Sequence, residues 1–87
     1  MMEYEWDDNK AATNLRNHGV TFEAVMDFDW EAATILEDDR RDYGEHRFIA
    51  YGPIGDRLHC LVFTLRGRRI RVISLRKANS REVRRYG

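Results

Sequence analysis

Arginine recurs at short intervals near the end of the chain, in the segment RGRRIRVISLR at residues 66–76. On an extended strand, residues two positions apart point to the same face of a sheet. A guanidinium group can donate two parallel hydrogen bonds to a phosphate, which suits it to contacts with a nucleic-acid backbone. From the residues alone, a nucleic-acid site and a generic basic surface are favoured about equally. A solvated edge or a surface for an acidic protein partner would carry the same segment.

Metal-free cleavage of RNA needs a base for the 2′-hydroxyl, an acid for the leaving oxygen and positive charge around the phosphate. Side chains that could transfer protons are those of Glu45, His46 and His18. Each has a structural alternative, because a histidine at a helix end can interact with the last carbonyl groups and Glu45 can pair with an arginine. Side chains that could supply the positive charge are those of Lys10, Arg47, Arg71 and Arg76.

The chain has no net charge, but its charges are unevenly distributed. Residues 1–39 hold eleven acidic and two basic residues, a net charge of −9. Residues 40–65 carry a net charge of +1, and residues 66–87, with nine basic residues and one acidic residue, carry +8. Such asymmetry indicates a phosphate-rich or acidic partner at one end. Neutralisation of the two ends by each other within the fold accounts for part of the charge.

Other kinds of site lack their sequence patterns. The three histidines and Cys60 are not spaced as metal ligands, so neither a metal site nor a cofactor is predicted. The aspartate pairs do not follow a calcium-loop pattern, and no phosphate-binding glycine loop or nucleophile elbow is present. Cys60 lies in an apolar run, so we expect its side chain to be buried. A single cysteine that forms no internal disulfide fits a protein of a reducing compartment. Without a signal peptide or a membrane-length apolar run, the cytoplasm is the expected location.

The basic segment must be positioned by a small fold, which we expect to be a single domain over residues 1–87. Strands are predicted at residues 2–6, 33–38, 46–52, 58–66 and 69–76. A polar loop at 38–45 and a turn at 52–57 separate three of them. Helices are predicted from Asp7 or Asp8 to Gly19, from Thr21 to near Asp29, and from a capping box formed by Asn79 and Glu82. This order predicts an α+β fold with a mostly antiparallel sheet.

The helices should bury one face each. In the first, Ala11, Leu15 and His18 are spaced to share one face. In the second, the expected apolar stripe consists of Phe22, Val25 and Met26, and the last helix could bury Val83 and Tyr86.

The last two strands should form a hairpin with a two-residue type II′ turn at Gly67 and Arg68. Leu65 then faces Ile70, Thr64 faces Arg71, and Phe63 faces Val72. One face of this hairpin carries Leu61, Phe63, Leu65, Ile70 and Val72. The other carries Cys60, Val62, Ile73 and Leu75 at the far end, with Thr64, Arg66, Arg69 and Arg71 near the turn. A three-residue loop would exchange the faces of one strand.

Three segments together resemble the BrnT toxins, a branch of the RelE-like ribonucleases of bacterial type II toxin–antitoxin systems. They are YEWDDNKAATNLRNHGVTFEAV at 4–25, DYGEHRFIAYG at 42–52 and RIRVISLRKANSREVRRYG at 69–87. Each is weak alone, but their order and spacing over nearly the whole chain are fairly specific. The family usually has Ser-Ala-Arg where this chain has Ser74-Leu75-Arg76, which puts the local packing in question.

The resemblance implies a RelE-like fold, with a small twisted antiparallel sheet, two N-terminal helices packed on it and a short C-terminal helix. It implies a metal-independent endoribonuclease that inhibits translation and is neutralised by a BrnA-type antitoxin. The complex would hold two copies of each chain and bind operator DNA through the antitoxin. The site cluster would consist of Lys10, His18, Glu45, Arg47, Arg71, Arg76 and Tyr86, with Arg66, Arg68 and Arg69 as further RNA-binding residues.

Within this cluster, the resemblance suggests that Glu45 or His18 moves protons while the lysine and arginines stabilise the transition state. The sequence also fits a non-catalytic, toxin-like module that serves only as antitoxin partner or co-repressor. Direct DNA binding by the basic tail is less favoured, because no helix-turn-helix pattern places these arginines in a groove.

Overall fold

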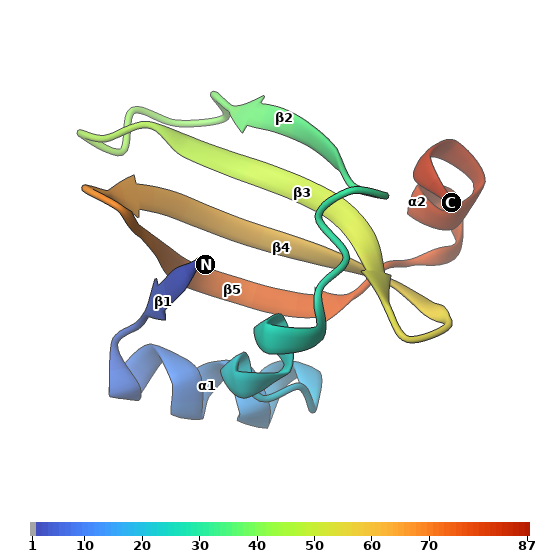
Figure 1. The fold of residues 1–87 in the computed structure, drawn as a ribbon, viewed down its shortest axis with the longest axis horizontal. Coiled ribbons are helices and arrows are strands. Elements are labelled where there is room, and N and C mark those ends of the chain that lie inside the picture. Colours follow the sequence, from blue (N-terminus) through green and yellow to red (C-terminus); the bar gives the residue numbers. More distant parts are fainter. Residues whose placement is uncertain (1) are drawn as a thin grey trace.

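Five strands form one sheet in the order β1-β5-β4-β3-β2 (Figure 1). The computed structural model describes residues 2–87. The strands are β1 (Glu3–Glu5), β2 (Thr34–Asp38), β3 (Arg47–Ile54), β4 (Arg57–Arg66) and β5 (Arg69–Lys77). Neighbouring strands from β2 to β5 are antiparallel, whereas β1 runs parallel to the first part of β5. The predicted α+β class with a mostly antiparallel sheet is confirmed.

Helix α1 (Asp8–His18) begins and ends where the sequence predicts. The Asp7 carboxylate accepts hydrogen bonds from the backbone N–H groups of Asn9 and Lys10 at 2.7 and 3.3 Å. Gly19 ends the helix with φ 70°, a left-handed conformation that glycine adopts without a steric penalty. The helix packs along β5 (Figure 1).

The face that α1 turns to the sheet differs in part from the predicted one, since Ala11 packs against the core as expected but Leu15 and His18 do not. Leu15 is 47% exposed and His18 is exposed, whereas Asn14 is buried. Asn14 Nδ2 donates to the carbonyl oxygen of Leu75 at 2.7 Å, and the Leu75 N–H donates back to Asn14 Oδ1 at 3.1 Å. Because β1 pairs only with residues 69–71 of β5, Asn14 supplies the hydrogen bonds that a further strand residue would otherwise make.

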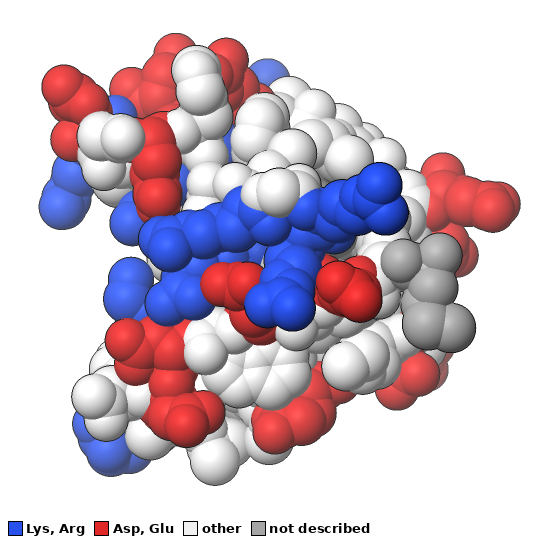
Figure 2. Space-filling model, turned by 60° about the vertical axis from the view of Figure 1, so that its left-hand side comes forward, with Lys and Arg blue, Asp and Glu red and all other residues white. Residues whose placement is uncertain are grey.

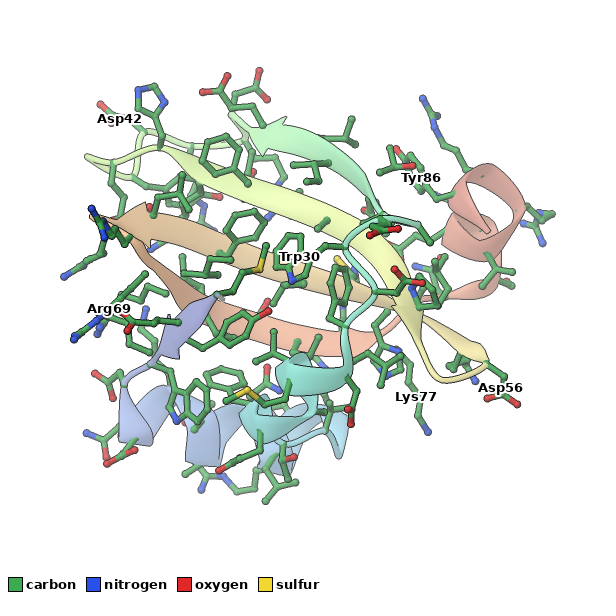
Figure 3. The ribbon with its side chains drawn as sticks, in the orientation of Figure 1. Trp30, Asp42, Asp56, Arg69, Lys77 and Tyr86 are labelled. Atoms are coloured by element: carbon green, nitrogen blue, oxygen red, sulfur yellow. The ribbon has the colours of Figure 1, made fainter. Side chains whose placement is uncertain are left out.

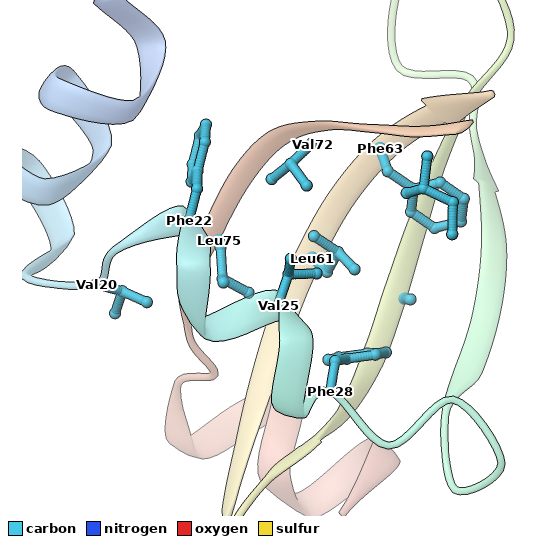
Figure 4. Close-up of a cluster of buried hydrophobic side chains, with 10 residues drawn as sticks. Val20, Phe22, Val25, Phe28, Leu61, Phe63, Val72 and Leu75 are labelled. Atoms are coloured by element: carbon cyan, nitrogen blue, oxygen red, sulfur yellow. The ribbon is translucent and has the colours of Figure 1, made fainter. Parts of the chain in front are cut away.

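The predicted second helix is a 3₁₀ helix, η1 (Phe22–Asp27), which crosses one face of the sheet. Its period of three residues places Phe22 and Val25 in the core, followed by Phe28. Met26, predicted to share the stripe, is instead 63% exposed. Figure 4 shows the core that η1 covers, which consists of Val20, Phe22, Val25, Phe28, Ala50, Leu61, Phe63, Ile70, Val72 and Leu75.

The two hairpin turns are tight. Strand β3 extends past the predicted end, since Pro53 pairs with Leu58, and the turn narrows to Gly55 and Asp56. In the β4–β5 turn, Gly67 has φ 60° and Arg68 does not have a positive φ. This combination confirms the predicted type II′ turn.

Helix α2 (Ser80–Tyr86) lies at the end of the sheet opposite the β4–β5 turn (Figure 1). The predicted capping box is present, because Glu82 N–H donates to Asn79 Oδ1 at 2.8 Å and Asn79 N–H donates to Glu82 Oε1 at 2.9 Å. Tyr86 is half-buried as expected, but Val83 is 41% exposed. No helix within residues 2–87 is both long and apolar enough to span a membrane.

The contact between Asn14 and Leu75 should be a main source of stability. Asn14→Ala leaves buried backbone groups without partners, at a cost of about 1–3 kcal/mol each. We therefore expect urea unfolding to show a loss of at least about 2 kcal/mol in the free energy of unfolding. The exposed Asn17 of the same helix provides the control, since Asn17→Ala should change stability by less than about 0.5 kcal/mol. Equal stabilities of the two variants would contradict this role of Asn14.

Candidate functional site

One extra residue in β5 decides where the side chains of that strand point. The hairpin register is the predicted one near the turn, but it shifts at Val62, where Ile73 is left without a partner as a β-bulge. Beyond the bulge, Leu75 pairs with Leu61, and both side chains are fully buried. The prediction that Leu75 shares a face with Cys60 is therefore wrong.

The bulge also brings polar residues of β5 together. In a regular strand, Arg71 and Arg76 would point to opposite faces, because they are five positions apart. In the structure they pair with Thr64 and Cys60, which are four positions apart on β4 and share one face. Ser74 lies between them on the same face, the one that η1 does not cover.

A third arginine completes this surface, which we call the arginine face: Arg47, Arg71 and Arg76. Arg47 pairs with Thr64 from the β3 side, opposite Arg71. Because neighbouring strands are about 4.8 Å apart, the backbones of Arg47 and Arg71 lie roughly 10 Å apart across the sheet. Arg76 pairs with Cys60, which lies four positions from Thr64 on β4, or roughly 13 Å along the strand. The three side chains therefore leave the sheet around one area of the same face.

Carboxylates hold two of these arginines. Arg71 Nη1 donates to Glu5 Oε2 at 2.7 Å, and this hydrogen bond lowers the pKa of Glu5. Arg47 Nε donates to Glu45 Oε2 at 3.3 Å, while Arg66 approaches the other oxygen of Glu45 at 3.7 Å. The Arg47 and Arg71 side chains are still 21% and 27% exposed. Thus part of the predicted positive surface is neutralised within the fold, and its arginines remain accessible.

Arg76 is held more firmly than the others. Its Nη1 and Nη2 donate to the two carboxylate oxygens of Glu82 at 2.8 and 2.9 Å, and Tyr51 OH donates to Glu82 Oε2 at 3.1 Å. These hydrogen bonds, that of Arg76 above all, lower the pKa of Glu82 to about 2. Tyr86 stacks on Tyr51 with ring centroids 4.1 Å apart and planes within 5°. Figure 3 shows Tyr86 at the end of the sheet opposite Arg69.

The loop before β3 adds side chains that the sequence analysis did not single out. Asp38 accepts from Arg40 Nε at 2.7 Å and Arg40 Nη2 at 2.8 Å, and its side chain is only 1% exposed. Tyr43 OH donates to the same carboxylate at 3.2 Å, and the Arg47 guanidinium lies 4.1 Å from the Tyr43 ring centroid. Asp38 pairs with Arg47 across β2 and β3, which puts both residues on one face, and this pairing is visible only in the structure.

Lys10 and His18 lie apart from the arginine face. Both line a groove of about 470 Å³ between α1 and the edge of β5. Ser74 also lines this groove, and it lies between Arg71 and Arg76 along β5. The groove and the arginine face therefore meet at Ser74, so that a long ligand could contact both.

The predicted RNA-binding residues lie at the β4–β5 turn. Arg69 approaches Glu3 at 3.5 Å and Glu5 at 3.6 Å, whereas Arg68 is exposed and forms no ion pair within residues 2–87. Figure 2 shows Lys and Arg side chains in a band across this end of the molecule, with Asp and Glu side chains on both sides. The turn thus extends the positive surface beyond the arginine face.

Residues 2–87 contain no group of three or more His, Cys, Asp or Glu side chains that could hold a metal ion. Cys60 is buried as predicted, and this burial raises the pKa of its thiol. A protonated thiol is a poor nucleophile and a poor metal ligand. The exposed His46 lies immediately before β3, with its Nδ1 2.9 Å from Glu37 Oε1. The groups available for chemistry are therefore cations, carboxylates, tyrosines and the imidazoles of His18 and His46.

Comparisons with known proteins agree on one family. The family model described as "Ribonuclease toxin, BrnT, of type II toxin-antitoxin system" matches residues 6–82. The crystal structure of the Brucella abortus ribonuclease toxin BrnT is similar, with a TM-score of 0.73 and 26% sequence identity. The alignment covers 92% of this chain and 100% of that one. A comparison with curated proteins found no match.

The contact between Asp38 and Arg40 should make stability depend on acid pH. The hydrogen bonds from Arg40 lower the pKa of Asp38 from 3.8 to about 2, so the stabilisation is complete above pH 4 and disappears as the pH falls towards 2. We expect Asp38→Asn to lose up to about 2 kcal/mol of unfolding free energy at pH 6. This difference from the parent protein should shrink as the pH approaches 2.

Urea unfolding at pH 6, 4 and 2.5 measures the difference, and Asp39→Asn at the adjacent exposed position is the control. A difference between Asp38→Asn and the parent that stays constant over this range would contradict the assignment.

Proposed function

Because the chain belongs to the BrnT family, the ribonuclease toxins of type II toxin–antitoxin systems, we propose that it cleaves RNA on its arginine face without a metal ion. The observation that best supports this proposal is the presence of Arg47, Arg71 and Arg76 on one exposed side of the sheet. A phosphodiester passing to a pentacoordinate transition state gains negative charge, and fixed guanidinium groups stabilise that charge.

The reaction we propose is attack by the ribose 2′-oxygen on the adjacent phosphorus. The new oxygen–phosphorus bond forms as the bond to the 5′-oxygen breaks, which leaves a 2′,3′-cyclic phosphate and a free 5′-hydroxyl. A base takes the proton of the 2′-hydroxyl, and an acid gives a proton to the leaving oxygen. No oxidant, reductant or second substrate is needed.

Two groups could transfer these protons. Glu45 lies beside Arg47 at the edge of the arginine face, where its carboxylate could accept the 2′-hydroxyl proton. His18 lies in the adjoining groove with Lys10. If an RNA chain crosses from the arginine face into this groove at Ser74, the His18 side chain could give a proton to the leaving oxygen. Lys10 would add positive charge there. We assign Tyr86 to the site through its stacking on Tyr51 beside Arg76.

The remaining contacts would hold the RNA chain on both sides of the bond that breaks. We assign phosphate binding to the residues of the β4–β5 turn: Arg66, Arg68 and Arg69. Their exposed side chains continue the positive band at that end of the molecule (Figure 2). Sequence-independent contacts of this kind should weaken as salt concentration rises.

In the cell, we propose that this single RelE-like domain acts in the cytoplasm and stops translation by cutting RNA. A type II system includes an antitoxin protein, which we propose is of the BrnA type. We further propose that two copies of each chain form the inactive complex, which binds operator DNA through the antitoxin.

The direct test is incubation of the purified chain with RNA in EDTA. We expect the parent protein to cut RNA under these conditions, and Arg76→Ala to cut it roughly 10²–10³-fold more slowly, as expected for the loss of one group that stabilises transition-state charge. Because Arg76 also anchors α2 through Glu82, Arg71→Ala serves as a second variant with the same expected direction.

Arg84→Ala, at an exposed position on α2, controls for the loss of one positive charge. Intact RNA beside a folded parent protein would contradict the ribonuclease proposal and favour a non-catalytic partner of the antitoxin. If Arg71→Ala and Arg76→Ala cleave RNA as fast as Arg84→Ala does, the site must lie elsewhere on the protein.

A further inference from the structure

We propose that Glu82 and Tyr51 are positioning residues that hold the Arg76 guanidinium so that its Nε–Nη2 edge binds a phosphodiester group of RNA. This inference rests on the proposed ribonuclease function and assigns a second task to Glu82, beyond capping α2. It follows from which hydrogen-bond donors of Arg76 the fold uses and which it leaves free.

A guanidinium group has five N–H donors arranged along three edges of a plane. Glu82 accepts one hydrogen bond from Nη1 and one from Nη2, which occupies the end of the group. The second hydrogen of Nη1 is directed at the carbonyl oxygen of Lys77, at 3.3 Å. No acceptor within residues 2–87 forms a hydrogen bond with Arg76 Nε.

The donors that remain are therefore Nε–H and the second hydrogen of Nη2. These two hydrogens point in the same direction from one edge of the guanidinium plane, and that fork fits two oxygens of a phosphate. The Arg76 side chain is 33% exposed, so a ligand on the arginine face can approach it. Glu82 lies at the other edge of the group, and its carboxylate does not compete for these donors.

Glu82 can orient Arg76 because it is itself held from two elements. Besides the two hydrogen bonds from Arg76, it accepts one from Tyr51 OH on β3 at 3.1 Å and one from the Asn79 N–H before α2 at 2.9 Å. The Glu82 side chain is only 13% exposed. Tyr86 stacks on Tyr51 and restricts the position of that ring. The carboxylate therefore has little freedom to move.

A fixed guanidinium has an advantage over a mobile one. An arginine on a flexible stem loses rotamer freedom when it binds a ligand, and it must reorganise as charge develops. Because Glu82 already holds Arg76 in the folded protein, the loss of rotamer freedom occurs during folding and not during RNA binding. The negative charge of Glu82 reduces the general attraction of the site for RNA. We therefore expect the benefit to appear in the chemical step more than in binding.

Glu82→Gln separates the two tasks of this residue. Glutamine also serves at this position of a capping box, so helix α2 keeps its cap. It offers one acceptor oxygen in place of two and carries no charge, so it cannot hold both Nη groups of Arg76. We expect the single-turnover cleavage rate constant to fall roughly 10–100-fold, with a change below about 3-fold in the Kd for an uncleavable 2′-O-methyl RNA oligonucleotide.

Asn79→Ala is the matched control, because it removes the other half of the capping box and leaves the Arg76–Glu82 contact in place. It should lower thermal stability and leave the cleavage rate constant of the folded protein unchanged. Tyr51→Phe removes one of the hydrogen bonds to Glu82 and should give a smaller loss of rate than Glu82→Gln.

A rate constant for Glu82→Gln within 2-fold of the parent value, or an equal loss in Asn79→Ala, would overturn the positioning role. If Arg76→Ala lowers the cleavage rate constant as expected while Glu82→Gln stays within 2-fold of the parent value, this inference fails and the proposed function stands. If the parent protein binds the oligonucleotide without cutting any RNA, the ribonuclease proposal fails. The positioning role then fails with it, because the benefit that this role predicts lies in the cleavage step.

Discussion

The hydrogen bonds between the Asn14 side chain and the backbone of Leu75 fix the part of β5 on which the candidate site depends. They lie two residues beyond the bulge at Ile73, where β1 no longer covers the edge of the sheet. A strand with an extra residue can slip, and a slip of one position exchanges its two faces. Because α1 holds Leu75 in the core, Arg76 must lie on the open face. A buried amide in one helix thereby sets the direction of a guanidinium group in the site.

The charges of the chain are arranged in pairs around this frame, and the pairs are not equivalent. The contact of Arg71 with Glu5 joins the acidic N-terminal segment to the basic hairpin, so the fold neutralises part of the charge asymmetry between the two ends of the chain. The contact of Arg76 with Glu82 is bidentate and partly buried, and its geometry selects one free edge of the guanidinium. Ion pairing in this protein therefore neutralises some cations and orients others.

The parts of the fold that were predictable from sequence are those set by local chemistry. Asp7 and Gly19 limit α1 by capping, and Gly67 fixes the turn that aligns the first half of the last hairpin. The bulge was not predictable from local sequence, and the contact that holds the strand beyond it joins Asn14 to Leu75, 61 positions apart. The family resemblance indicated Arg76 and Tyr86. The role of Tyr51 and the free edge of the Arg76 guanidinium could not be read from residue spacing, because both depend on contacts between residues far apart in the sequence.

A double-mutant cycle of Arg71→Ala and Arg76→Ala on the cleavage rate constant tests the central claim most directly. If the bulge places both guanidinium groups around one phosphodiester, their contributions depend on each other, and the double variant should lose much less than the product of the two single losses. Strictly multiplicative losses would show that the two residues act independently, which would contradict a shared site on the arginine face.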